Sequence, residues 1–119
     1  MPSRDEHYSK AEHNERFANS FALDSTPYLD WVVTGFFYSA IHYIDSYLAH
    51  FHSIHPYSHE DRDDKVRRYL RRINKDYREL KDDSKDARYN MRNFRADEIR
   101  NDILPLFNNI KNTITQSLI

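Results

Sequence analysis

The chain has no cysteine, and this absence excludes several kinds of chemistry at once. Disulfide bonds, zinc sites with cysteine ligands, iron–sulfur clusters and thiol catalysis all require that residue. Glycine occurs once and proline four times among the 119 residues. An all-β fold needs many turn-forming residues of these two types, so their scarcity favours a helical protein.

Long apolar runs and a strong charge imbalance are also absent. No stretch approaches the roughly 18 consecutive apolar residues of a membrane-spanning helix, so we expect no membrane partner. The first residues are polar and lack the pattern of a signal peptide, and we therefore expect a cytoplasmic protein. The formal net charge is only −1, which by itself favours no class of partner.

Aromatic and other apolar residues are plentiful enough to build a core. Aromatic side chains make up 14% of the chain and apolar residues 39%. A chain of this length has room for one well-formed core but not for two. We predict a single domain over residues 1–119, in which residues 1–7 form a flexible tail.

Apolar residues recur at helical spacing along most of the chain. The predicted fold is all-α, an up-and-down bundle of four main helices and a short fifth helical turn. The main helices are expected from Ser9 up to the break before Pro27, from Pro27 to Phe51, from Ser58 to Lys81 and from Ala96 to Ser117, and the short turn from Ser84 to Tyr89. Pro105 is expected to kink the last helix.

The second predicted helix is apolar around most of its circumference, which places it at the centre of the bundle. It carries one polar stripe at helical spacing, formed by Thr34, Tyr38, His42 and Asp45. Two interpretations are open. The stripe is either the solvent-facing side of this helix, or His42 and Asp45 form an acid–base unit beside which Tyr38 binds a phosphate.

Histidines cluster around the end of this helix, at His50, His52, His55 and His59. Imidazoles bind zinc or nickel, but a metal site built only from histidines of one short loop is uncommon. Pro56 also interrupts the helix that would bring His55 and His59 to one face. The sequence therefore predicts no metal and no cofactor, and one or two of these imidazoles are expected to face a functional site.

A run of basic residues follows, with Asp76 as the only acidic residue inside it: Lys65, Arg67, Arg68, Arg71, Arg72, Lys75 and Arg78. On one continuous helix, most of these side chains share the face opposite the apolar stripe. Such a ridge neutralises phosphates and binds nucleic acid in a salt-dependent manner. The alternative is a solvated face that pairs with the acidic residues on either side of the run.

Arg88 stands in the short segment between the last two main helices. An arginine there could hold a phosphate or stabilise the charge on a leaving group. It could equally cap the C-terminus of a neighbouring helix.

Four segments together resemble the HEPN superfamily of small helical-bundle proteins. They read Ala-Glu-His-Asn at 11–14, Asp-Trp-Val-Val-Thr-Gly-Phe-Phe-Tyr-Ser-Ala-Ile-His-Tyr at 30–43, His-Pro-Tyr-Ser-His-Glu-Asp-Arg at 55–62 and Ser-Lys-Asp-Ala-Arg-Tyr at 84–89. The resemblance implies a helical bundle that is often dimeric. It also implies an activity as a metal-independent ribonuclease or toxin, or a role as a non-catalytic nucleotide-binding domain.

The chain departs from that family at its active signature, an Arg followed four to six residues later by a His, because it contains no such pair. A ribonuclease built on this sequence would need other catalytic residues, and the candidates are Tyr38, His42, His55, His59 and Arg88. The candidate nucleic-acid contacts are Arg62, Arg68, Arg71, Arg72 and Lys75. We expect RNA or a nucleotide as ligand, a homodimer, and an antitoxin or another protein as a further partner. The alternative function is a non-catalytic module that binds a nucleotide, RNA or a protein.

Overall fold

The computed structural model describes residues 1–119, and every regular element in it is helical, which confirms the predicted all-α bundle. Five helices form its body: α1 (Arg4–Asn19), α2 (Leu29–His52), α3 (His59–Tyr69), α4 (Asn74–Tyr89) and α6 (Leu104–Ser117). Three short elements connect them: η1 (Arg71–Ile73), α5 (Ala96–Glu98) and η2 (Ile99–Ile103). None of the helices combines the length and the apolar character that crossing a bilayer requires.

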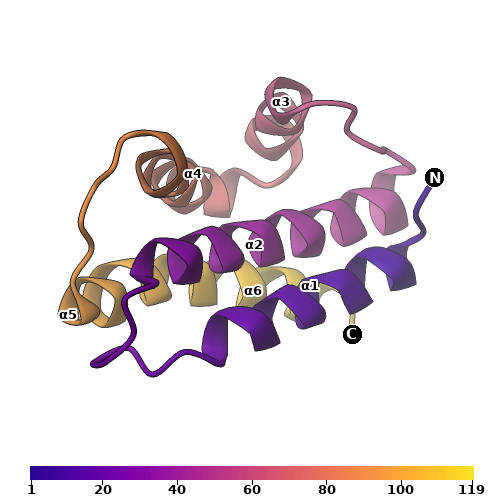
Figure 1. The fold of residues 1–119 in the computed structure, drawn as a ribbon. Coiled ribbons are helices and arrows are strands. Elements are labelled where there is room, and N and C mark those ends of the chain that lie inside the picture. The colour runs from indigo at the N-terminus through magenta and orange to yellow at the C-terminus, as the bar shows by residue number, and fades with distance from the viewer.

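Helix α2 is the centre of the bundle, as its apolar circumference predicts. It lies between α1 and α6 on one side and the pair α3 and α4 on the other (Figure 1). Fourteen of its 24 residues are buried, and all the buried apolar side chains of the protein form one continuous cluster around it. The side chains of α2 are therefore positioned by neighbours on nearly every side.

The chain becomes helical earlier than the sequence predicts. Helix α1 starts at Arg4, where the Ser3 hydroxyl accepts a hydrogen bond from the Glu6 amide and the Glu6 carboxylate accepts one from the Ser3 amide. The predicted start at Ser9 is therefore wrong, and so is the predicted flexible tail for residues 4–7. A side-chain N–H of Arg4 donates to the Leu118 carbonyl at 3.3 Å, which holds the two ends of the chain together.

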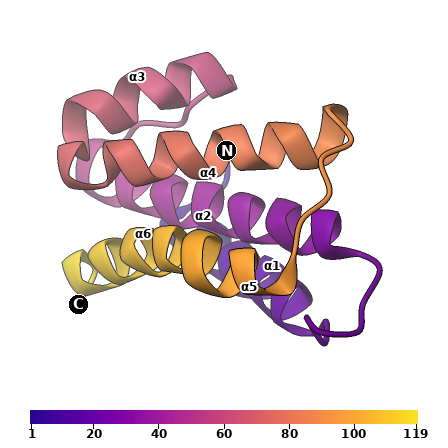
Figure 2. The same ribbon diagram turned by 90° about the vertical axis from the view of Figure 1, so that its left-hand side faces the viewer.

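The single helix predicted from Ser58 to Lys81 is two helices. The backbone leaves the helical region at Leu70 (φ −131°, ψ 50°), and α3 folds back along α4 in the opposite direction (Figure 2). In this arrangement the Tyr77 hydroxyl donates to Asp63 at 2.6 Å. In an unbroken helix these two residues would lie about 21 Å apart along the axis. The segment from Ser84 to Tyr89, predicted as a separate turn, is the end of α4.

Residues 96–117 form one helical path with an irregular turn. The turn is a π-helix at Ile99–Ile103, just before Pro105, for which the sequence predicts a kink. Proline has no amide proton to donate, so the backbone around it must depart from regular α-helical hydrogen bonding. The departure leaves Ile99, Ile103 and Phe107 buried against the core.

Candidate functional site

The polar stripe of α2 faces other helices, so its interpretation as a solvent-facing side is wrong. Thr34 and Asp45 are buried, while Tyr38 and His42 are half-buried. Three of the four side chains contact three different helices: Tyr38 contacts α4, Asp45 contacts α3 and His42 contacts α1. The Thr34 hydroxyl donates a hydrogen bond to the carbonyl of Asp30, one turn earlier in the same helix.

Asp45 and Arg62 form a buried ion pair between α2 and α3. Nε and Nη2 of Arg62 donate to Oδ1 and Oδ2 of Asp45, both at 2.9 Å. The two residues are only 4% and 9% exposed. Burial opposes the charge of Arg62, but the hydrogen bonds and the charge of Asp45 outweigh it and raise the pKa of Arg62. Arg62 is therefore not available as the predicted nucleic-acid contact, and Asp45 does not hydrogen-bond His42 in the predicted acid–base unit.

The partner of His42 is instead His7 on α1. Their Nδ1 atoms lie 3.1 Å apart, so one nitrogen carries the proton and the other accepts it. Burial lowers the pKa of both imidazoles, although the charge of Asp45 acts in the opposite direction. One donor atom each from His7, His42 and Asp45 lies within 4.8 Å of the others, and this trio could hold a metal ion.

His7 is a functional candidate that the sequence pattern did not predict, because residues 1–7 were expected to form a flexible tail. The signal was present in the spacing Ser3 to Glu6, which marks a helix start just before it. His7 then shares one helical face with Ala11 and Ala18, both of which are buried.

The four histidines around the end of α2 do not gather into one site. His50 and His52 are exposed, and the His52 ring packs on Tyr69. The His55 Nδ1 atom is buried without a hydrogen-bond partner. His59 has its Nδ1 atom 3.3 Å from Nη1 of Arg62. Because arginine can only donate, the His59 proton belongs on Nε2.

Arg88 lies on α4 against the first half of α2, beside Tyr38, which was also predicted as a site residue. Its Nη1 donates to the Tyr38 hydroxyl at 2.9 Å and its Nε to the Ser84 carbonyl at 3.2 Å. The guanidinium lies 5.6 Å from the centre of the Phe37 ring and 5.1 Å from that of Tyr89. It makes no salt bridge with a carboxylate, in contrast to Arg62.

A groove runs past Arg88 between the start of α2 and the end of α4. It consists of two hollows of about 550 and 350 Å³ that share Asp30, Ala87 and Arg88 in their walls. Trp31 and Tyr89 line the smaller hollow and are 54% and 72% exposed. Two aromatic faces and one guanidinium are therefore open to a ligand from solvent.

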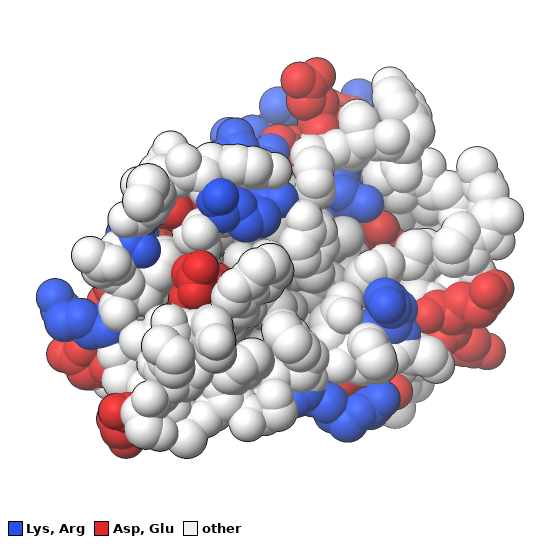
Figure 3. All heavy atoms as spheres, viewed as in Figure 1, with Lys and Arg blue, Asp and Glu red and all other residues white.

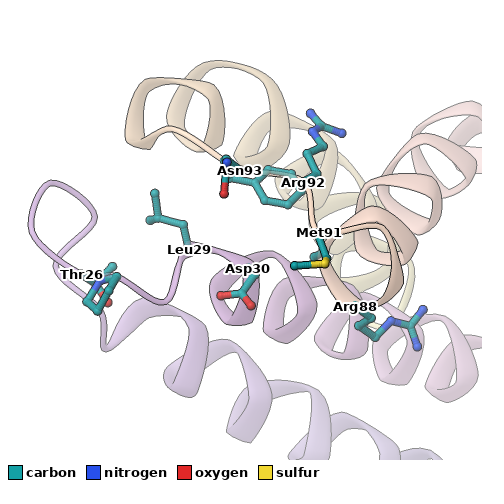
Figure 4. Close-up of a pocket in the computed structure, with 10 residues that line it drawn as sticks. Thr26, Leu29, Asp30, Arg88, Met91, Arg92 and Asn93 are labelled. Atoms are coloured by element: carbon teal, nitrogen blue, oxygen red, sulfur yellow. The ribbon is translucent and has the colours of Figure 1, made fainter.

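The charges of the groove are distributed unevenly. In Figure 4 the guanidinium of Arg88 points away from the carboxylate of Asp30, and the two come from opposite walls. Arg92 lines the larger hollow but is engaged by the carboxylates of Asp83, Asp86 and Glu98, whose hydrogen bonds raise its pKa against the opposing effect of burial. Arg88 is thus the cation of the groove that is left for an anionic ligand.

The basic ridge predicted from 65 to 78 does not form one helical face, because the chain breaks at Leu70. Arg67, Arg68, Arg71 and Asn74 instead line a separate hollow of about 410 Å³ where α3 turns into α4. Arg67 is paired with Asp64 at 2.6 Å, whereas Arg68, Arg71, Arg72 and Lys75 make no salt bridge. Figure 3 shows the same pattern on a wider scale, with basic groups in separate clusters interspersed with acidic ones.

Four of the five predicted catalytic residues, all but His55, fall in two places. Tyr38 and Arg88 lie together. His59 lies near them, because its ring stacks on the Phe37 ring, which also contacts Arg88; the centres of the His59 and Phe37 rings are 6.1 Å apart. His42 lies with His7 further along α2. No protein-family model, curated protein or solved structure matches the chain, so its function has to be inferred from these residues.

Proposed function

We propose that this protein is an RNA-directed helical module of the HEPN type that binds one nucleotide of its ligand in the groove beside Arg88. The observation that carries the proposal is a half-buried guanidinium with no carboxylate partner in a groove lined by exposed aromatic rings. A half-buried cation without a counter-ion favours an anion from solvent, and arginine suits the geometry of phosphate oxygens.

Arg88 is oriented for this role by its neighbours. Two of its five N–H groups are used by Tyr38 and Ser84, and the other three are left for phosphate oxygens. Stacking against Phe37 and Tyr89 limits the motion of the guanidinium, so less conformational entropy is lost on binding. The hydroxyl of Tyr38 accepts from Arg88 beside the same position, and its own proton is left to donate to a phosphate oxygen.

Trp31 and Tyr89 offer flat faces for the nucleotide base. Stacking of a base on an aromatic side chain contributes about 1–3 kcal/mol and tolerates any base, because every base has a π-face. The carboxylate of Asp30 in the same groove accepts hydrogen bonds from an amino group or a ribose hydroxyl. A ligand with a phosphate at one end and such donors at the other fits both charges of the groove.

The arginine-lined hollow at the other end of α4 extends the contact. Asn74 and Arg88 are 14 residues apart on this helix, which corresponds to about 21 Å. A strand of several nucleotides spans that length, so Arg68 and Arg71 would contact phosphates several nucleotides away from the one in the groove. These contacts add affinity without sequence preference and make the binding depend on salt.

Fluorescence anisotropy with a short labelled single-stranded RNA tests the proposal. We expect Arg88→Ala to weaken binding about 10- to 100-fold, the range for a lost hydrogen bond to a charged group. Arg16→Ala is the matched control, since Arg16 is an exposed arginine on α1 and should leave the affinity nearly unchanged. Equal affinities of the two variants would remove the groove as the binding site.

Catalysis on RNA is a second candidate, favoured by the stacking of both His59 and Arg88 on Phe37. Burial lowers the pKa of His59, and the charges of Arg62, Lys81 and Arg88 add to this effect. A neutral imidazole acts as a general base, so His59, once its Nδ1 is released from Arg62, would take the proton of a ribose 2′-hydroxyl. The 2′ oxygen would attack the adjacent phosphate to form a 2′,3′-cyclic phosphate, and the 5′ oxygen would leave with a proton from water while Arg88 stabilises the charge on the phosphate.

Incubation of labelled RNA with the protein in EDTA separates the two candidates. A ribonuclease of this kind cleaves in EDTA and loses its activity in both His59→Ala and Arg88→Ala. Absence of cleavage by a protein that binds the same RNA leaves the binding module. Cleavage that is undiminished in both variants would exclude this pair as the catalytic site.

A further inference from the structure

We propose that His7, His42 and Asp45 form a site for a divalent transition-metal ion such as Zn²⁺, with His55 as a fourth donor. The site lies at the other half of α2 from the groove, and it does not depend on the RNA-directed function. It revises the expectation from the sequence that the protein holds no metal. The donor types, two or three imidazoles and one carboxylate, suit zinc, nickel and cobalt better than magnesium or calcium.

The spacing of the donor atoms supports the site. Zinc binds imidazole nitrogen at about 2.0–2.1 Å, so two nitrogens on a tetrahedral ion lie roughly 3.3 Å apart. The two Nδ1 atoms of His7 and His42 are 3.1 Å apart and therefore need almost no movement. All three donors lie within 4.8 Å of one another, so a displacement of about 1.5 Å brings the most distant of them to the ion.

The hydrogen bond between the two rings lies where an ion would bind. In the absence of an ion, one Nδ1 carries a proton and the other accepts it. An ion would take the place of this proton, which would move to Nε2 of the same ring. Both neutral rings would then bind the ion through Nδ1 and carry their one proton on Nε2.

His55 adds an independent observation. Its Nδ1 atom is buried and has no hydrogen-bond partner in the protein, which is an unusual state for a buried polar atom. His55 is not among the residues whose donor atoms lie within 4.8 Å of one another, so its ring would have to move toward the trio to bind the ion. A buried ring nitrogen that lacks a partner is suited to complete four-fold coordination after such a movement.

Arg62 would serve as the outer partner of the carboxylate ligand. Both oxygens of Asp45 accept from Arg62, and each oxygen retains a second lone pair for an ion. Hydrogen bonding of a ligating carboxylate to an outer residue is the usual arrangement in metal sites. The ion would connect α1, α2 and the loop before α3, and it would therefore stabilise the fold.

Isothermal titration of the metal-stripped full chain with Zn²⁺ tests the site. We expect one ion per chain and a melting temperature that rises with the Zn²⁺ concentration. Co²⁺ in place of Zn²⁺ should give the visible absorption of a tetrahedral nitrogen–oxygen site. Histidine ring NMR of the wild-type chain should show the resonances of His7, His42 and His55 shifting on addition of Zn²⁺, and this measurement needs no variant.

Three variants and a control locate the ligands. His7→Gln and His42→Gln should each weaken binding by more than about tenfold, and His55→Gln by about tenfold. The control is the double variant His13→Gln/His50→Gln, which removes two exposed histidines and should bind as the wild type does. Unchanged affinity in His55→Gln would overturn the assignment of the fourth donor.

Other outcomes would overturn the site as a whole. Absence of stoichiometric binding to the wild type would do so, as would loss of binding in the control with retention in His7→Gln. If a variant fails to fold, as judged by its circular dichroism, the ring NMR of the wild type decides alone. Zn²⁺-dependent shifts confined to exposed histidines would then reject the proposal.

Discussion

The two halves of α2 hold polar groups in opposite circumstances. In the second half, Asp45 and His42 are satisfied by Arg62 and His7, and nearly all of these groups are removed from solvent. In the first half, the groove presents Arg88 with no counter-ion and the partly exposed ring of Trp31. The difference shows which polar groups hold the helices together and which are left for a ligand. The sequence pattern does not reveal it, because the polar stripe runs along both halves of α2.

The contrast has an energetic basis. A buried charge is tolerated only when it is paired and hydrogen-bonded, so the second half of α2 cannot lose one partner without a large cost. A half-exposed arginine stays hydrated, so its charge is tolerated without a counter-ion until a ligand binds. We therefore expect substitutions in the second half to act on stability and those in the first half to act on binding.

The largest expected effect is at the buried pair. Asp45→Leu or Arg62→Met alone should lower the free energy of unfolding by about 3–5 kcal/mol, because each leaves an uncompensated buried charge or an unpaired acceptor. The double variant should recover much of this loss. Urea denaturation measures all three, with Arg67→Met at an exposed ion pair as the control that should change little. If the single variants are as stable as that control, the second half of α2 does not depend on its buried ion pair and the proposed difference between the two halves is wrong.

The next effect concerns Asp63, which attaches α3 to Tyr77 and Lys81 of α4. Arg62 lies on the same helix and is held in place by this attachment. Although burial favours the neutral acid, hydrogen bonds from Lys81 and Tyr77 lower the pKa of Asp63 below its ordinary value of 3.8. The folded protein therefore binds this proton less readily than the unfolded chain. The contribution of Asp63 to stability is present above pH 3.8 and is lost as the pH falls through the folded-state pKa.

Thermal melts between pH 3 and pH 7 check this dependence. Asp63→Asn should melt below the wild type at neutral pH, and the difference between the two should shrink as the pH falls below about 4. Asp82→Asn, an exposed carboxylate on α4, is the control and should follow the wild type throughout. A gap that stays constant with pH would mean that the charge of Asp63 does not stabilise α3.

A smaller effect is expected in the groove, and on binding instead of stability. Trp31→Ala should weaken RNA binding by about 1–3 kcal/mol through the lost stacking, while the free energy of unfolding changes by no more than about 0.5 kcal/mol. Tyr57→Ala removes an aromatic ring that is 88% exposed in the loop before α3 and should affect neither property. Anisotropy and urea denaturation on the same samples give both numbers. A large loss of stability in Trp31→Ala would make the first half of α2 structural as well.

The smallest net effect is expected at Gly35, which faces α1. A Cβ atom there would lie 3.0 Å from Cδ2 of Phe17 and 3.1 Å from Cβ of Ala18. The gain of about 1 kcal/mol in helix propensity for Gly35→Ala is offset by overpacking, because the Cβ of Ala18 cannot rotate away. We expect a net destabilisation of about 1 kcal/mol or less, measured by urea denaturation. A clear stabilisation would show that α1 shifts freely along α2.

Local patterns in the sequence were sufficient for part of the structure. The scarcity of glycine, the apolar circumference of α2 and the start of a helix at Ser58 are all local features of the chain, and the predictions based on them are confirmed. The site was predicted less well. Arg62 was assigned to nucleic acid and His7 to a tail, because their contacts with Asp45 and His42 join residues 17 and 35 positions apart.

The sequence by itself determined the helical class, the central position of α2 and the polar stripe along it, because periodicity and composition express local free energies. Only the tertiary structure decided where α3 separates from α4 and what each residue of the stripe contacts. The break at Leu70 is stabilised by contacts such as that between Asp63 and Tyr77, which exist only after the chain has folded back. The same folding pairs Arg62 with Asp45 in the second half of the stripe. It places Arg88 of α4 beside Tyr38 in the first half, where Arg88 has no counter-ion.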